Sequence, residues 1–172
     1  MKLHGDERLF RQAITATATQ LHIPEIFIEK DYWVTYALHS VFNDPIGEET
    51  MFKGGTALSK SIGLIDRFSE DIDLVVQHHA EETDNQLKRK IRRIGQVVSS
   101  MLPEVEVEGL TRKMGMNRKT AHSYPNIFRG SFGQVRNVIV VEATWFGYYE
   151  PYIAHPLSSY IYNPVGCFWF AK

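Results

Sequence analysis

Two stretches in the first 42 residues carry apolar side chains at helical spacing. The first runs from Glu7 to about Leu21, and the second continues from Pro24 to Phe42. Proline is favoured in the first turn of a helix, where its missing N–H would have no intrahelical partner. The pattern therefore predicts a pair of N-terminal helices.

Residues 50–76 predict a strand, a turn, a helix and a further strand. A short apolar run at residues 51–52 is cut off by Gly54 and Gly55, as at the end of a strand. Thr56 can cap the helix that follows, because its hydroxyl can accept a hydrogen bond from a free first-turn N–H. The apolar positions of this helix are Leu58, Ile62 and Ile65. The run DIDLVV, residues 71–76, is then a strand.

The remaining pattern adds one helix and two strands. Residues 81–102 have an apolar side and a basic side, as in a surface helix, and residues 104–108 alternate glutamate and valine, as in a half-exposed strand. Residues 111–133 show no clear period. The run VRNVIVVEATWF, residues 135–146, is apolar on both faces in its middle and predicts a central strand. Together these elements predict an α/β or α+β domain, with a central mixed sheet flanked by helices.

The chain length of 172 residues fits a single domain. We divide it into N-terminal helices (1–48), a sheet core (49–145) and an aromatic-rich tail (146–172). Ten of the 21 aromatic residues lie between Trp145 and Phe170, which predicts a packed rather than a solvated terminus.

Composition narrows the class of protein. Hydrophobic residues make up 44% and charged residues 23% of the chain, as in soluble globular proteins. The single cysteine, Cys167, excludes an intrachain disulfide framework. The polar start and the lack of an apolar run of about 18 residues predict a cytoplasmic protein without signal peptide or membrane span.

Basic residues are concentrated in one stretch, although the net charge is only −1. Residues 86–136 hold eleven basic residues against three acidic ones. Such a stretch is either a solvated surface or the site that binds an acceptor such as RNA along its phosphate backbone. Among the basic residues of the aperiodic region, where loops often carry function, four are our candidates for binding the acceptor: Lys113, Arg118, Lys119 and Arg129.

The turn after residues 51–53 has the features of a phosphate site. Two glycines let the backbone approach a ligand closely, and the first-turn N–H groups of a helix attract an anion. Lys60 lies on the first turns of this helix and can neutralise the same phosphate. Lys53 is equally compatible with a phosphate ligand and with a solvated lysine.

Asp71 and Asp73 are two residues apart on the predicted strand, so their side chains share one face, with Ile72 on the other. Two such carboxylates repel each other unless a cation holds them. Hard oxygen ligands select Mg²⁺ or Mn²⁺, and paired metals can clamp the attacking and leaving oxygens of a phosphoryl transfer. A phosphate-binding turn beside this pair therefore predicts a phosphoryl-transfer site.

Three strings, in this order, resemble the AbiEii/AbiGii toxin nucleotidyltransferases of the polymerase-β-like superfamily: EKDYWVTYAL (29–38), KGGTALSK (53–60) and GLIDRFSEDIDL (63–74). The resemblance implies a polymerase-β-like fold and a bacterial toxin of a toxin–antitoxin or abortive-infection system. It also implies metal-dependent transfer of a nucleoside monophosphate from an NTP. The resemblance and the turn chemistry together assign the triphosphate to Gly54, Gly55, Thr56, Ser59 and Lys60, and the metals to Asp71 and Asp73.

Members of the superfamily place a third carboxylate on a later central strand, and Glu142 is our candidate. It is the one acidic residue in an otherwise apolar strand, where a lone carboxylate is costly unless it is paired or bound to metal. The alternatives are an exposed residue at the strand end or an ion pair with Arg136.

Several other residues have a structural explanation that needs no ligand. Tyr32 and Trp33 are expected to pack on the core. Arg67 and Ser69 can equally make a structural ion pair or a turn hydrogen bond. The two histidines at residues 78–79 are predicted to lie in a loop rather than to bind zinc, since the side chains of adjacent residues point apart.

The leading hypothesis is a Mg²⁺-dependent nucleotidyltransferase that uses an NTP and an acceptor such as tRNA or another RNA, with a cognate antitoxin as partner. Full-length members of the family that the chain resembles continue with a helical region, and by this resemblance the chain is expected to be the sheet domain alone or a shortened variant. The alternative is therefore a catalytically inactive module that keeps the fold and binds an antitoxin, or a second copy of itself, through an exposed aromatic tail.

Overall fold

The computed structural model describes residues 2–62, 71–130, 136–145, 154–162 and 169–171, with backbone alone for 61–62 and 169–171. The helices are α1 (Glu7–Leu21), α2 (Glu25–Phe42), α3 (Gly54–Ala57) and α4 (Asp84–Ser99), with short helical turns at Leu3–Gly5, Pro45–Glu49 and Leu58–Ile62. The strands are β1 (Thr50–Lys53), β2 (Asp71–Val76), β3 (Glu104–Val105), β4 (Arg112–Met114), β5 (Asn117–Ser123), β6 (Val138–Thr144), β7 (His155–Leu157) and β8 (Trp169–Ala171).

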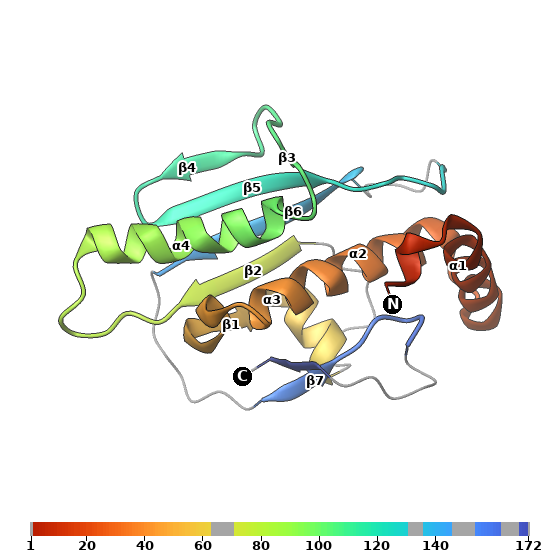
Figure 1. Ribbon diagram of the computed structural model, residues 1–172, viewed down its shortest axis with the longest axis horizontal. Helices are drawn as coiled ribbons and strands as arrows, with labels where there is room; N and C mark the ends of the chain where they lie inside the picture. Colours follow the sequence, from red (N-terminus) through yellow and green to blue (C-terminus); the bar gives the residue numbers. More distant parts are fainter. Residues whose placement is uncertain (1, 63–70, 131–135, 146–153, 163–168, 172) are drawn as a thin grey trace.

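The main sheet is mixed. Its strand order is β1-β2-β6-β5-β3, with β4 also paired to β5, and β7 and β8 form a separate two-stranded sheet. Strands β2 and β6 run parallel, and the other pairs of the main sheet are antiparallel. Helices α2 and α4 lie across one face of the sheet (Figure 1). The predicted fold class and the central position of residues 138–144 are confirmed.

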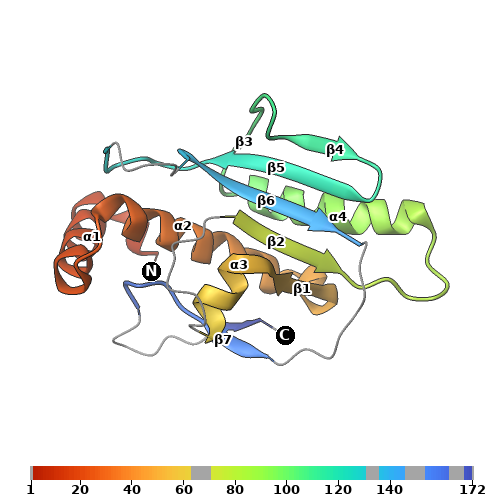
Figure 2. The same cartoon turned by 180° about the vertical axis from the view of Figure 1, so that it is seen from behind.

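The two faces of the central strands differ in chemistry because strand side chains alternate. Ile72, Leu74, Val141 and Ala143 are at most 2% exposed and belong to the core cluster that includes residues of α2 and α4. The side chains between them, Asp71, Asp73 and Glu142, therefore project from the opposite face. In Figure 2, which is turned by 180° from Figure 1, this face of β2, β6 and β5 is toward the viewer.

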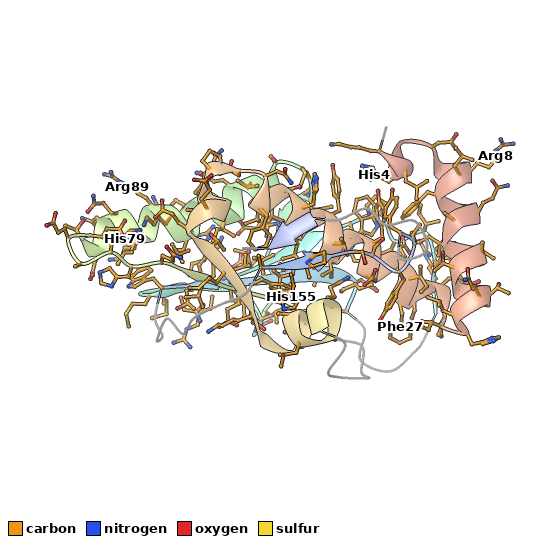
Figure 3. The ribbon with its side chains drawn as sticks, turned by 90° about the horizontal axis from the view of Figure 1, so that it is seen from below. His4, Arg8, Phe27, His79, Arg89 and His155 are labelled. Atoms are coloured by element: carbon orange, nitrogen blue, oxygen red, sulfur yellow. The ribbon has the colours of Figure 1, made fainter. Side chains whose placement is uncertain are left out.

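The predicted helix and strand at residues 81–108 are both shorter than the pattern indicated. Helix α4 begins at Asp84, because Thr83 and Gln86 form a capping box that satisfies the first free N–H groups. The glutamate–valine alternation yields only the two residues of β3. Helix α4 turns its charged side chains away from the sheet, as Arg89 shows in Figure 3.

The aperiodic region contains a β-hairpin that the sequence pattern did not reveal. Strands β4 and β5 are joined by a two-residue turn, Gly115–Met116. Gly115 has φ +59° and Met116 does not have a positive φ, so the turn has the type II′ pattern, which favours glycine at its first central position. Gly115 was the one local signal of a hairpin. The two strands show no apolar alternation, because most of their residues are charged or polar.

The turn after β1 also differs from the prediction. The helix begins at Gly54 rather than after Thr56, and Thr56 is not its cap. The Thr56 hydroxyl donates instead to the backbone carbonyl of Asp71 at 2.5 Å, which ties the turn to β2. Leu58 is 39% exposed and does not face the core. Ile62 and Ile65 lie outside the side chains that the structure describes, as do Arg67 and Ser69.

Helix α2 is held by buried charges as well as by apolar contacts. Glu29 is 1% exposed and accepts hydrogen bonds from the backbone N–H groups of Ile127 and Phe128. Lys30 is fully buried and donates to the carbonyls of residues 136 and 138, where β6 begins. Tyr32 and Trp33 pack in the core, as predicted. The buried charges thus connect α2 to the loop and strand that lead toward Glu142.

The described part of the aromatic tail is packed rather than solvated. Leu157 is 3% exposed, and Tyr160, Ile161 and Tyr162 pack partly buried against the core. These side chains therefore do not form the free apolar surface that the alternative hypothesis requires. Among the helices in the described ranges, none is long and apolar enough to cross a membrane.

Candidate active site

A row of charged residues crosses five strands of the sheet on the face opposite α2 and α4. The cross-strand register places Lys53 opposite Asp73, Asp73 beside Glu142, Glu142 opposite Lys119 and Lys119 opposite Arg112. Residues at matched positions of adjacent strands project from the same face. Two carboxylates at the centre of the sheet are thus flanked by lysine on one side and by lysine and arginine on the other.

Gly54 is in direct contact with this row. It has φ +81°, and a β-carbon added there would lie 2.1 Å from Oδ2 of Asp73 and 3.0 Å from its Cγ. Any side chain at position 54 would therefore displace the carboxylate, besides straining the backbone. The predicted phosphate turn and the predicted metal ligand meet at this point.

Glu142 is positioned by two neighbours from β5. Asn117 donates from Nδ2 to Oε1 at 2.6 Å, and Lys119 Nζ lies 3.2 Å from Oε2. Burial alone would raise the pKa of Glu142, but these two hydrogen bonds, together with the positive charges of Lys119 and Lys53, outweigh burial and hold the pKa below its usual value. The expected alternative partner, Arg136, pairs instead with Asp71 at 3.1 Å.

The three carboxylates fit a divalent cation by their chemistry. They are hard oxygen donors on adjacent parallel strands and on one face of the sheet. Asp71 and Glu142 each have a basic neighbour that supplies positive charge, while Asp73 forms no ion pair with any residue that the structure describes. A bound cation would take over the role of Arg136 and Lys119 at these carboxylates.

The family assignment rests on a match to the sequence from residue 37 to residue 171. The matching family model is described as the nucleotidyl transferase AbiEii toxin of a type IV toxin–antitoxin system. The chain belongs to the AbiEii family. This confirms the family that the three strings indicated, although most of the first string, residues 29–36, lies outside the match.

A solved structure with a similar arrangement is MenT4, a nucleotidyltransferase toxin from Mycobacterium tuberculosis H37Rv. It is 20% identical to this chain, with a TM-score of 0.45, and the match covers 77% of this chain and 44% of MenT4. The match thus spans less than half the length of that protein. A search of curated protein sequences returned no match.

In this AbiEii chain, Lys60, which the sequence analysis placed at the triphosphate, lies outside the carboxylate row. Its ammonium forms an ion pair with Asp31 of α2 and donates to the Thr35 hydroxyl at 2.8 Å. Asp31 also accepts a hydrogen bond from the backbone N–H of Tyr160. The side chains of Lys60 and Asp31 are 9% and 4% exposed. Lys60 therefore links the turn to α2 and the tail, and the charge of Asp31 already neutralises it.

The remaining members of the predicted triphosphate site stay near the turn. Gly55 lies in the first turn of α3, and Ser59 is half-buried and donates to the carbonyl of Thr56 at 3.1 Å. The Thr56 hydroxyl is engaged with the backbone of Asp71, so this residue contributes to the shape of the turn.

The four basic residues predicted to bind an acceptor do not form one surface. Lys119 lies in the carboxylate row, whereas Lys113 and Arg118 both pair with Glu104. Residues 118 and 119 are neighbours on β5 and point to opposite faces. Arg129 lies in an exposed loop beyond β5. The register thus separates Lys119 from Lys113 and Arg118, and adds Arg112, which the sequence analysis had not selected.

A second group of potential ligands lies at the other end of β2. Among the residues that the structure describes, Glu49, His79 and Glu82 bring a carboxylate or imidazole atom within 4.8 Å of one another. Lys90 forms ion pairs with both glutamates and supplies the positive charge there. His79 lies in a loop, as predicted, and the group is explained by this ion-pair network.

The ionisation of Asp73 lowers the stability of the folded AbiEii chain. Burial raises its pKa, and the nearby charges of Glu142 and Asp71 raise it further. A carboxyl group with a higher pKa in the folded chain binds protons more tightly when folded. Stability is therefore lost as the pH rises from the unfolded pKa through the folded pKa.

We expect Asp73→Asn to remove this loss in the metal-free protein. The melting temperature of the variant relative to wild type should rise as the pH increases from about 4 toward neutrality. Glu108→Gln, a matched loss of charge at an exposed site, is the control and should show no such trend. A variant that melts below wild type at every pH would show that Asp73 is a structural partner instead.

Proposed function

We propose that this AbiEii chain transfers a nucleoside monophosphate from an NTP to a nucleic-acid acceptor such as tRNA or another RNA. The observation that carries the proposal is the contact of Gly54 with Asp73, in register with Glu142. A turn that can approach phosphates closely and carboxylates suited to metal ions are thereby adjacent on one face.

Each residue of the row has a role in this reaction. Gly54, Gly55 and Ser59 would bind the triphosphate, and Lys53 lies on the same side of the carboxylates. Asp71, Asp73 and Glu142 would hold Mg²⁺ or Mn²⁺, which when bound neutralises charge on the phosphoryl oxygens. Asn117 orients Glu142 through its 2.6 Å hydrogen bond, and thereby keeps the third carboxylate beside Asp73.

The family match also supports a role in a toxin–antitoxin system. Its description as a type IV toxin supports an antitoxin as the partner of this chain. NTPs and RNA are both available in the bacterial cytoplasm, where we expect the protein to act.

The test is transfer of radiolabel from each of the four NTPs into total bacterial RNA, with Mg²⁺, with Mn²⁺ and with EDTA. We expect label to appear only with a divalent ion and from a subset of the NTPs. Asp71→Ala, purified in parallel, measures contaminating activity. Equal signals from wild type and Asp71→Ala would refute the assignment, as would transfer in EDTA.

A further inference from the structure

The side chain of Arg112 is exposed on the same face as the three carboxylates. It lies directly opposite Lys119, which itself contacts Glu142 at 3.2 Å. Within the described parts of the chain, the Arg112 guanidinium has no hydrogen-bond or ion-pair partner. Its neighbour Lys113 points to the other face and pairs with Glu104 at 2.6 Å. The hairpin therefore leaves one cation free on the carboxylate face and neutralises the next one on the opposite face.

The order of the strands determines which side of the carboxylates is open to an acceptor. The turn proposed to bind phosphate follows β1, so a bound triphosphate and its leaving pyrophosphate would lie on the β1 side of Asp73. In a phosphoryl transfer the attacking and leaving oxygens lie roughly in line on opposite sides of the phosphorus. The attacking hydroxyl must therefore approach from the side of β6, β5 and β4.

The distance from Glu142 to the outer strand suits a nucleic-acid strand. Adjacent strands lie ~4.8 Å apart, so β4 is roughly 10 Å from β6. A nucleic-acid strand in helical form carries a phosphate about every 3.4 Å along its axis. A strand that ends at Glu142 and runs across the sheet would bring its first few phosphates past Lys119 and then Arg112.

We propose that Arg112, in one row with Lys119 and Glu142, binds the phosphate backbone of the acceptor strand and directs its terminal hydroxyl to the carboxylates. This inference rests on the proposed function and specifies its acceptor side. The exposed basic face of α4 has no part in it, because that helix lies on the other face of the sheet.

The test compares two variants that each remove one positive charge from β4, Arg112→Gln and Lys113→Gln. Binding of a 5′-fluorescent single-stranded oligoribonucleotide with a free 3′ hydroxyl is measured by anisotropy at several salt concentrations, with a DNA oligonucleotide of the same sequence in parallel. Loss of one phosphate contact lowers the magnitude of the slope of log affinity against log salt by about 0.7. This corresponds to an affinity about fivefold weaker at 0.1 M salt. We expect this loss for Arg112→Gln and less than a twofold change for Lys113→Gln.

Equal losses in both variants, or unchanged binding by Arg112→Gln, would overturn the inference. We expect Mg²⁺ and NTP to raise the melting temperature of both variants and of wild type equally, because neither residue lies on the β1 side. If wild type transfers no label but Arg112→Gln alone weakens binding, the acceptor surface stands and the proposed transfer fails. If wild type transfers label and Arg112→Gln leaves the acceptor KM unchanged, the transfer stands and the inference fails.

Discussion

Gly54→Ala should abolish nucleotide transfer as completely as removal of the Asp73 carboxylate. The added methyl carbon would lie 2.1 Å from Asp73 Oδ2, so the carboxylate must turn away or the turn must move. A displacement of about 1 Å in a catalytic group can lower a rate ~100-fold. We therefore expect at least a hundredfold loss of label transfer, and loss of the rise in melting temperature that Mg²⁺ and NTP produce together.

Gly109→Ala is a control that separates the effect of the contact with Asp73 from the effect of backbone strain. Gly109 has φ +71°, close to that of Gly54, and no atom lies within 4 Å of a β-carbon added there. Both variants pay a similar penalty for alanine at positive φ, on the order of 1 kcal/mol. Gly109→Ala should melt at a similarly reduced temperature but keep its activity. Similar losses of activity in the two variants would mean that the contact with Asp73 has no catalytic importance.

Among the ion pairs of the residues that the structure describes, the Asp31–Lys60 pair should show the largest loss of stability when it is broken, as in Asp31→Ala. The substitution leaves the ammonium of Lys60 without a counter-ion at a site where its side chain is only 9% exposed. Removal of one partner of a buried ion pair costs about 3–5 kcal/mol, because the remaining charge stays desolvated. Urea denaturation should show this loss in the midpoint, and the Tyr160 N–H should lose its hydrogen-bond acceptor.

A double variant tests whether the unpaired charge is the cause. Asp31→Leu with Lys60→Met replaces both charges by apolar groups, and such replacements are often close to neutral. We expect it to recover most of the stability lost in Asp31→Ala. Glu7→Ala, which breaks an exposed pair with Arg11, should cost at most about 0.5 kcal/mol. A full loss in the double variant would show that hydrogen bonding, rather than charge pairing, holds the segments together.

The double variant also bears on the nucleotide site. The sequence placed Lys60 at the triphosphate, whereas the structure places it against Asp31. If Lys60 binds phosphate, the double variant will lose the NTP-dependent rise in melting temperature even where it is stable. We expect that rise to remain.

The sequence by itself determined the local features of the site. Helical and strand periodicities predicted α1, α2, β2 and β6, because each pattern repeats over neighbouring residues. The period of two placed Asp71 and Asp73 on one face, and the glycine pair predicted a turn close to a ligand. The strings that carry these residues also indicated the family that the match to residues 37–171 confirmed.

The tertiary structure alone decided which side chains meet. Lys60 pairs with a residue 29 positions earlier, and Asp71 pairs with Arg136, 65 positions later. Such contacts depend on strand order and register, which no local pattern encodes. A one-residue change in the register of β4 against β5 would exchange the faces of Arg112 and Lys113. The hairpin turn at Gly115 sets that register, and it therefore decides which basic residue stands beside the carboxylates.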